Sequence, residues 1–439
     1  MSESSMGAPI GGHGLPSPPS DLEETGRRLG RLGRTLLIAG GALILIAAIG
    51  RLTGAPELTS SGTFAAAIRL GAPIMLAGLG GVFAERVGVV NIGLEGMMIL
   101  GTWFGAYIAW LYGPWWGVLG AVLGGAAGGL LHALATVTFG VDHIVSGVAI
   151  NILAGGVARF LSVIAYPPGS GGGATQSPRI AERVGRMDVP FLAGGQIFGW
   201  QTPDLFGWLE RTRVFIVADV AAILRALTTN MSWLIVLSIA LIFVSWYLLW
   251  GTPLGLRMRS VGEHPVAAES VGVPVYTMKY IGVTISGALA GLGGAILVLE
   301  AAGIYREGQT GGRGFIGLAA MIFGNWRPGG AAAAASIFGY ASALQLRDET
   351  AVHGLLLFVA IALLLAAAYM VWRRSLGKAL ALVAVAAVFG FWWLTTDAVP
   401  RQFIFFTPHV TTLVVLAFAT QRLRMPAADG MRYRKGQSA

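Results

Sequence analysis

The stretch LAGLGGVFAERVGVVNIGLEGMMILGTW at residues 76–103 decides the fold, because two parts of it recur, in the same order, in the second half of the chain. LAGLGG at 76–81 recurs at 289–294, and IGLEGM at 92–97 recurs as IGLAAM at 316–321. The two matches recur at similar offsets, 213 and 224 residues further along the chain. Internal similarity of this kind within hydrophobic sequence is typical of transporters built from two related halves.

The composition is that of an integral membrane protein. The chain of 439 residues is 55% hydrophobic and 12% charged, whereas a soluble chain carries about a quarter charged residues. The 65 glycines suit helices that pack closely in lipid. The absence of cysteine excludes disulfides, thiol catalysis and Cys-ligated metals. The net charge of +9 comes from residues between hydrophobic segments, which favours a role in orientation and predicts no nucleic-acid partner.

The apolar segments predict an all-α, polytopic transmembrane protein with two inverted repeats and about 10–12 spans, one of them a half-helix. They fall at about 35–52, 64–83, 88–111, 115–138, 143–165, 231–250, 276–300, 313–325, 330–346, 354–372, 378–395 and 403–421. A spanning helix needs about 20 residues. The segment 313–325 is too short, so we interpret it as a half-helix or re-entrant segment.

Counting the half-helix as a crossing places both termini on the same side. Basic residues in the tails and short loops favour the cytoplasm for that side. The predicted organisation is a disordered cytoplasmic tail at 1–34, a transmembrane domain at 35–425 with an external loop at 167–230 and a cytoplasmic loop at 251–275, and a cytoplasmic tail at 426–439. The external loop has amphipathic stretches such as Trp208–Val220. Because a loop of this length is usually functional or disordered, it is a candidate docking surface for a substrate-delivering partner.

Polar residues within the apolar segments are candidates for a substrate pathway. Asn91 and Glu95 lie four residues apart, which predicts one helical face, and Glu95 either lines a pathway or pairs with a neighbouring helix. Ser146 and Asn151 form a polar stripe that enters the fifth span. In the second half, Arg313 begins the half-helix, and Phe315 lies close behind it. Such groups suit sugar hydroxyls or a nucleobase, although most aromatic residues in membrane proteins serve packing.

The cytoplasmic loop GTPLGLRMRSVGEHPVAAESVGVPV at 251–275 contains a predicted short helix. Pro265 suits its first turn and Gly272 its end, which leaves about two turns. This segment either transmits motion to a soluble partner or is a solvated turn.

The sequence offers no residues for catalysis or metal binding. It contains no GxxxxGK[ST] phosphate loop, no HExxH or GxSxG motif and no dinucleotide fingerprint in a suitable context. We therefore expect neither a cofactor nor enzymatic activity.

As a set, six segments resemble ABC importer permeases of the branch that serves nucleosides, simple sugars and branched-chain amino acids, and the resemblance is closest to the nucleoside-type permease subunit. They are ERVGVVNIGLEGMMILG at 85–101, VSGVAINILA at 145–154, LGLRMRSVGEHPVAAESVGV at 254–273, SGALAGLGGA at 286–295, GRGFIGLAAMIFGNWRPGGA at 312–331 and PAADGMRYR at 426–434. Two features depart from the family pattern: the longer N-terminal tail and a predicted helical hairpin inserted at 352–400.

The resemblance implies a permease in the cytoplasmic (inner) membrane of a prokaryote that imports nucleosides by alternating access. Its expected partners are a second homologous permease subunit or a second copy of the chain, a cytoplasmic ATP-binding subunit that holds the ATP, an extracytoplasmic substrate-binding protein or lipoprotein, and membrane lipid. The implied residues for coupling to the ATPase are Arg257, Arg259, Gly262, Glu263, Pro265, Glu269 and Gly272. The alternatives are a ribose-type sugar permease and an ion-coupled secondary transporter that uses Glu95.

Overall fold

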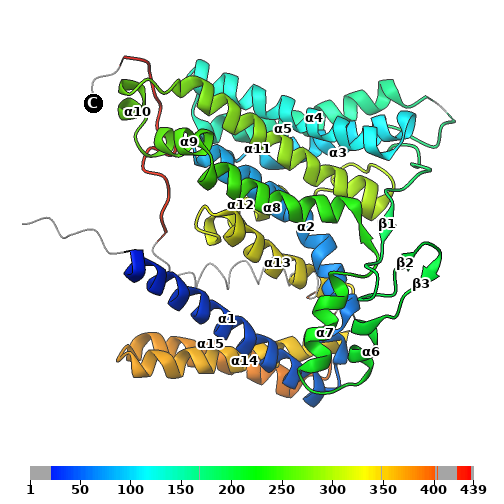
Figure 1. Cartoon of the computed structure of the whole chain (residues 1–439). Coiled ribbons are helices and arrows are strands. Elements are labelled where there is room, and N and C mark those ends of the chain that lie inside the picture. The colour runs from blue at the N-terminus through cyan, green and yellow to red at the C-terminus, as the bar shows by residue number, and fades with distance from the viewer. Residues whose placement is uncertain (1–20, 168, 348, 401–402, 404–422, 437–439) are drawn as a thin grey trace, which may run out of the picture.

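The computed structural model describes residues 21–436 except 168, 348, 401–402 and 404–422 (Figure 1). The first half contains α1 (Asp21–Leu52), the 3₁₀ helix η1 (Pro56–Thr59), α2 (Ser61–Glu85), α3 (Leu94–Tyr112), α4 (Pro114–Ala133) with its π-helical extension η2 (Leu134–Thr138), and α5 (His143–Ala165). The second half contains α8 (Trp233–Gly251), α9 (Pro253–Glu263), α10 (Pro265–Ser270), α11 (Val275–Ala295) with its π-helical extension η3 (Ile296–Ala302), α12 (Arg313–Phe323), α13 (Pro328–Leu344), α14 (Glu349–Trp372) and α15 (Leu376–Thr395).

The all-α, polytopic prediction is confirmed. Among the described residues, eight helices are long and apolar enough to cross a membrane: α2, α3, α4 with η2, α5, α8, α11 with η3, α14 and α15. The half-helix α12 has 11 residues, which cover about 17 Å at 1.5 Å per residue and cannot cross the bilayer alone. The predicted last span at 403–421 lies almost entirely outside the described residues.

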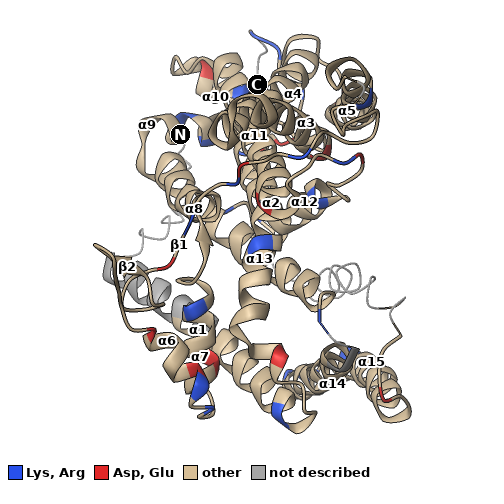
Figure 2. Ribbon diagram, turned by 90° about the vertical axis from the view of Figure 1, so that its right-hand side faces the viewer, with Lys and Arg blue, Asp and Glu red and all other residues tan. Residues whose placement is uncertain are grey.

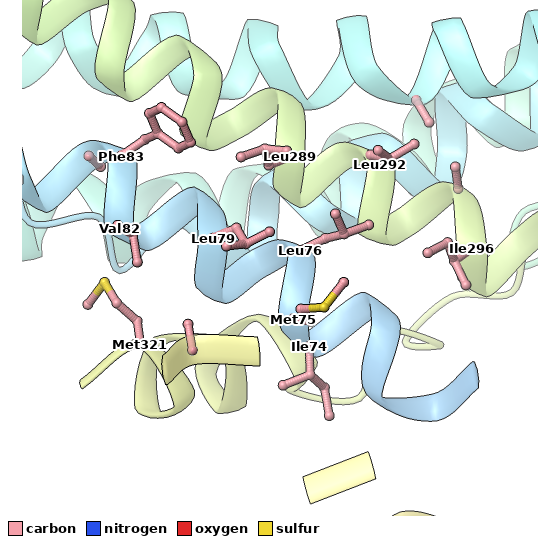
Figure 3. Packing of buried hydrophobic residues seen from close by; sticks show 14 of the residues in the cluster. Ile74, Met75, Leu76, Leu79, Val82, Phe83, Leu289, Leu292, Ile296 and Met321 are labelled. Atoms are coloured by element: carbon pink, nitrogen blue, oxygen red, sulfur yellow. The ribbon is translucent and has the colours of Figure 1, made fainter. Parts of the chain in front are cut away.

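Helix α2 forms the centre of the larger helix group. Its apolar side chains pack against α11 and α12, as Leu76 and Leu79 of α2 and Leu289 of α11 show in Figure 3. Both Leu76 and Leu79 are fully buried. Because α2 has neighbours on every side, the apolar sequence around 76–103 reads as a continuous hydrophobic run rather than as an amphipathic stripe.

The two halves meet at α2 and α11 through contacts that are two-fold related. A Cβ atom added to Gly80 would lie 2.6 Å from the carbonyl oxygen of Ser286, and one added to Gly293 would lie 3.0 Å from that of Pro73. Aligning LAGLGG at 76–81 with its repeat at 289–294 makes Gly80 equivalent to Gly293, and Pro73 equivalent to Ser286. Each contact is therefore the counterpart of the other, and the two helices cross antiparallel.

The same symmetry extends to the flanking helices. Helix α4 packs on α11, and α13 packs on α2. At the α4–α11 contact, a Cβ on Gly125 would lie 2.2 Å from the carbonyl oxygen of Gly287, so the two backbones approach to a distance that side chains would prevent. These reciprocal packings are what the inverted repeat of the sequence predicts.

Helices α14 and α15 pack against each other, and α1 contacts α14. In Figure 1 these three helices lie apart from the group around α2. The hairpin predicted at about 354–372 and 378–395 is present as this α14–α15 pair. An apolar cavity of about 880 Å³ lies between α1, α14 and α15 on one side and α2, α8 and α13 on the other.

The long loop at 167–230 is largely ordered. It contains the two-residue strands β1 (Arg186–Met187), β2 (Gln196–Ile197) and β3 (Trp200–Gln201), and the helices α6 (Leu205–Arg211) and α7 (Val217–Ala226), and it is followed by β4 (Met231–Ser232). Strands β1 and β4 pair antiparallel, as do β2 and β3. The amphipathic stretch Trp208–Val220 covers the end of α6 and the start of α7. The chain turns between them at Arg213 and Ile216, which have φ values of 55° and 67°.

Two boundaries differ from the sequence predictions. Helix α1 begins at Asp21, so residues 21–34 of the tail that was predicted to be disordered are helical, consistent with their content of the good helix formers Leu, Glu and Arg. The segment predicted at 88–111 becomes helical only at Leu94, because the chain turns before the helix at Gly88, which has a φ of 77°.

Candidate functional site

The carboxylate of Glu95 holds the N-terminus of the half-helix α12. Glu95 lies in the first turn of α3 and is 7% exposed. The backbone N–H of Gly312 donates to its Oε1 at 2.9 Å, and that of Gly314 donates to its Oε2 at 2.7 Å. A carboxylate at a helix N-terminus pairs free N–H groups and interacts favourably with the helix dipole. Of the two roles considered for Glu95, the structure shows pairing with a neighbouring helix.

Asn91 lies before α3, in the non-helical stretch 88–93. The prediction that Asn91 and Glu95 share one helical face is therefore wrong, because the helix begins only at Leu94. The Asn91 side chain is completely buried. Its Nδ2 donates to Ser286 Oγ at 2.9 Å, and its Oδ1 accepts from the N–H of Gly93 at 3.1 Å. Asn91 thus connects the stretch before α3 to the central helix of the other half.

Side chains of α4 and α5 hold the same stretch from the other side. The Ser146 hydroxyl is hydrogen-bonded to Nδ1 of His132 at 2.9 Å, and Nε2 of His132 lies 3.0 Å from the carbonyl oxygen of Val90. Asn151 Nδ2 donates to the carbonyl oxygen of Ile92 at 3.0 Å, and its Oδ1 accepts from the Gly96 N–H at 2.7 Å. These contacts satisfy buried backbone groups that a non-helical segment cannot pair by itself.

Arg313 and Phe315 occupy the first turn of α12. The Arg313 guanidinium donates to the carbonyl oxygens of Gln309 and Thr310 at 3.2 and 3.0 Å, so it holds the loop that precedes the helix. Phe315 is 46% exposed. The six predicted pathway residues lie in or near one region around the α3 and α12 N-termini, where five make intramolecular polar contacts and Phe315 faces outward. Their contact with a substrate stays a prediction.

The predicted short helix of the 251–275 loop is α10, and it is preceded by α9, which sequence reasoning missed. His264 caps α10, because its Nδ1 accepts from the N–H of Ala267 at 3.2 Å. Pro265 is the first helical residue, and Gly272 ends the turn with a φ of 83°. Thr252 caps α9 in the same way, accepting from the N–H of Gly255 at 3.1 Å. Thr252 followed by Pro253 is the start signal that would have revealed α9.

Some of the residues expected to act in coupling are exposed on this helix pair, and others pack against the rest of the molecule. Arg257 is exposed, and Glu263 is exposed at the end of α9. The Arg259 guanidinium lies 5.5 Å from the Trp250 ring centroid, and Glu269 is half-buried. A Cβ on Gly262 would lie 2.3 Å from the carbonyl oxygen of Arg86, so α9 rests directly on the backbone that follows α2.

The C-terminal segment 423–436, here called the strap, crosses this face of the molecule (Figure 1). The Ala428 N–H donates to the carbonyl oxygen of Gly262 at 2.9 Å, and the Ala427 N–H donates to Glu263 Oε2 at 3.2 Å. The Arg424 N–H donates to Asn325 Oδ1, beyond α12, at 2.7 Å. The strap therefore connects α9 to the segment between α12 and α13.

A cluster of charged residues lies beneath the strap. The Glu85 carboxylate accepts from the Trp326 indole N–H, and Arg86 donates to the Trp326 carbonyl oxygen at 2.9 and 3.1 Å. Asp429 of the strap lies beside Glu85, Arg86 and Lys279, and burial raises the pKa of its carboxyl to about 6. Sequence reasoning placed Glu85 and Arg86 merely at the membrane edge. The adjacent acid and base at the end of an apolar helix were the available signal, but Trp326 and Asp429 lie more than two hundred residues away along the chain.

Within the described part of the chain, no group of three or more His, Cys, Asp and Glu side chains could hold a metal ion.

Residues 63–368 match the protein family described as branched-chain amino acid transport system / permease component. The chain belongs to this family. The resemblance found in the sequence motifs is thereby confirmed, and the permease is a multi-pass membrane protein rather than an enzyme.

The permease has several relatives of similar length. It is 34% identical over 373 residues to the guanosine ABC transporter permease protein NupQ of Bacillus subtilis, and the aligned region covers 83% of this chain and 94% of NupQ. It is 34% identical over 376 residues to the nucleoside ABC transporter permease protein NupC of Lactococcus lactis, with coverage of 83% and 94%. It is 32% identical over 298 residues to the putative glucose ABC transporter permease protein TsgC13 of Haloferax volcanii, with coverage of 66% and 79%. No solved structure matches the chain.

Membership among ABC transporter permeases implies association with other ABC components, such as an ATP-binding subunit and a second permease. The family therefore favours an ATP-driven transporter over the ion-coupled alternative that would use Glu95.

Proposed function

We propose that this chain is the membrane-spanning permease subunit of an ATP-driven importer that moves nucleosides into the cytoplasm by alternating access. The observation that carries the proposal is the similarity to NupQ and NupC, whose names specify guanosine and nucleoside transport, across 94% of each relative. The inverted repeat gives two halves that can rock against each other around α2 and α11.

The helix pair α9–α10 supports a coupling role. It projects at one end of the bundle (Figure 1), and Leu256 and Val271 expose 61% and 78% of their surface there. Exposed apolar side chains next to charged ones suit a protein interface. In this proposal, the ATP-binding subunit docks on α9–α10 and holds the ATP, and the permease itself holds no cofactor.

The strap and α10 share the same end of the molecule. If that end is cytoplasmic, the excess of basic residues follows the positive-inside rule, the C-terminus lies in the cytoplasm, and so does the N-terminus. We place the permease in the cytoplasmic membrane of a prokaryote with this orientation.

The opposite end offers a surface for a substrate-binding protein or lipoprotein. Around the β2–β3 hairpin, Phe198, Trp200 and Trp208 expose 108%, 60% and 59% of their surface, and exposed aromatic residues are common centres of binding. The nearby helices are fixed to the bundle. Arg225 bridges Asp204 and Glu210 at 2.9 Å each, and Glu210 accepts from the N–H of Ser61 at the start of α2.

The second permease subunit, a homologous chain or a second copy, would pack against the outer face of α5. The apolar part of this span is only 22% buried within the chain. A partner subunit covers one part of such a surface, and membrane lipid covers the rest.

The test is uptake of labelled guanosine by cells with and without the gene, in competition with other nucleosides, ribose, glucose and leucine. Gene-dependent uptake that nucleosides block and the other compounds do not block supports the proposal. Guanosine uptake that is unchanged by deletion, with sugar transport lost instead, refutes the substrate. The similarity to TsgC13 makes a simple-sugar permease the second candidate.

A further inference from the structure

Helix α5 carries a charged side chain on its outward face. Arg159 lies within the apolar span His143–Ala165, and its side chain is 62% exposed. The exposed residues around it include Ile152 and Phe160, at 73% and 65%. Arg159 is six residues from the end of α5, which places its Cα about 9 Å inside the helix end. A charged group in such a span faces water or a partner, because facing lipid is costly.

The counter-charge comes from the other half of the chain. Glu307 Oε1 lies 3.7 Å from Arg159 NH1, and the Glu307 side chain is 38% exposed. Glu307 is in the loop between η3 and α12, and its backbone N–H donates to the carbonyl oxygen of Thr175 at 2.8 Å. Among the described residues, this ion pair is the one polar contact found for the Arg159 guanidinium. The guanidinium therefore has N–H groups available to a further ligand.

One side of α5 leads inward from the pair, and its residues 151, 155 and 159 are here called the track. Asn151, Gly155 and Arg159 are spaced by four residues and so lie on one side of the helix. A Cβ added to Gly155 would meet no atom within 4 Å. Asn151, at the inner end of the track, holds the N-terminus of α3 next to Glu95. The track therefore ends at the contact between α3 and the half-helix α12.

The track is at the margin of the molecule. Figure 2 shows α5 and α12 on the same side, with α1, α14 and α15 at the opposite end. A partner subunit on this margin would enclose the track without displacing any described helix. The Arg159–Glu307 pair would then lie at the mouth on the side of the β1–β3 loop, where a ligand arrives from outside.

We propose that Arg159 and Glu307 form the outermost cargo-binding position of the import path, and that they recognise the base of an uncharged nucleoside. The guanidinium donates to acceptor atoms of the base, as arginine does to O6 and N7 of guanine. The carboxylate accepts from a neighbouring N–H donor of the same base. This inference rests on the proposed function, because it assigns a contact to a nucleoside. A purely structural ion pair is the alternative.

The chain has no native cysteine, so water access can be measured with single cysteines in the complete transporter with its partner subunits. Arg159→Cys and Glu307→Cys are treated from outside with a membrane-impermeant thiol reagent. Phe160→Cys is the matched control, because it lies at the same depth but about 100° around the helix. We expect both cysteines of the pair to react and Phe160→Cys to remain unmodified. If the cysteine at 159 reacts no faster than the one at 160, the inference is refuted.

Protection by cargo tests the binding step. Guanosine, delivered with the binding component present, is expected to slow modification at 159 and 307 severalfold. Fast modification that no nucleoside slows refutes cargo binding at the pair. Protection by ribose or glucose but not by guanosine refutes recognition of a base and, together with sugar uptake, refutes the proposed substrate. That result still leaves the pair in the water-filled path, so the two failures are distinguishable.

Transport kinetics separate binding from a structural role. Arg159→Gln is expected to raise the KM of guanosine uptake about tenfold, as for loss of a hydrogen bond to a charged group, with little change in the maximal rate. The control is Arg347→Gln, which breaks a similar ion pair, 4.0 Å from Glu57, and leaves KM unchanged. The charge swap Arg159→Glu with Glu307→Arg restores an ion pair but reverses donor and acceptor. If the swap restores the normal KM, the pair is structural and the proposal fails.

Discussion

Replacing Glu95 with glutamine should loosen the half-helix α12. The carboxylate accepts from two backbone N–H groups, those of Gly312 and Gly314, with one oxygen each. Glutamine keeps a single acceptor oxygen, so one buried N–H loses its partner at a cost of about 1–3 kcal/mol. The lost attraction between the negative charge and the helix N-terminus adds about 1 kcal/mol. The sum is about 3 kcal/mol, which increases local opening of α12 about 100-fold.

Opening of α12 can be measured with a cysteine at Met321, which is fully buried on that helix. Because the chain has no cysteine of its own, the rate of thiol modification of Met321→Cys reports the fraction of time that α12 is open. Glu95→Gln should raise that rate about 100-fold. Glu57→Gln is the control, because Glu57 is half exposed and its ion pair with Arg347 is 4.0 Å long.

A rate that changes less than threefold in Glu95→Gln would refute the reasoning about the α12 N-terminus. If uptake were lost at the same time, and its pH dependence with it, Glu95 would act in the transport chemistry itself. The ion-coupled alternative would then regain support.

Three further results are expected. Gly125→Ala should lower the melting temperature of the purified complex, since its Cβ would lie 2.2 Å from a backbone oxygen of α11, whereas Gly390→Ala in α15, with no atom within 4 Å, should not. Gly262→Val should displace α9 from Arg86 and reduce co-purification of the ATP-binding subunit; unchanged recovery would contradict the role of α9. Burial raises the pKa of Asp429 from its usual value of 3.8 to about 6. The strap therefore packs most strongly at pH values below 3.8, and its packing weakens as the pH rises through 6. Asp429→Asn should remove this pH dependence from hydrogen exchange of residues 423–436; if the dependence persists, another group causes it.

The sequence alone supports prediction of the membrane class, most helix positions and the half-helix, because these depend on local hydrophobicity and length. Predicted and observed ends of α5 coincide, for example, at residues 143 and 165. The inverted repeat was also predictable, since LAGLGG at 289–294 copies 76–81. In contrast, the non-helical stretch around Asn91 is held by partners on α4, α5 and α11, and no local pattern identifies such distant partners.

The candidate site was predicted as a region but not as a set of interactions. Apolar surroundings correctly singled out Glu95 as a residue that needs a polar partner. Pattern reasoning does not show whether the partner is a backbone N–H or a substrate. The ion pair between Arg159 and Glu307 joins residues from different halves of the chain, so only the fold brings its members together.

The contact between α2 and α11 has a consequence for how the two halves can differ. A two-fold interface between identical subunits repeats every substitution on both sides. Because both halves lie on one chain, equivalent positions are free to diverge, and at the crossing they have done so. Pro73 has no backbone N–H and so removes one helical hydrogen bond from α2, whereas its equivalent Ser286 supplies a hydroxyl that accepts from Asn91. One helix of the crossing thus lacks a backbone hydrogen bond, and the other is held by a side-chain bond that can break, so the two halves need not change conformation in step.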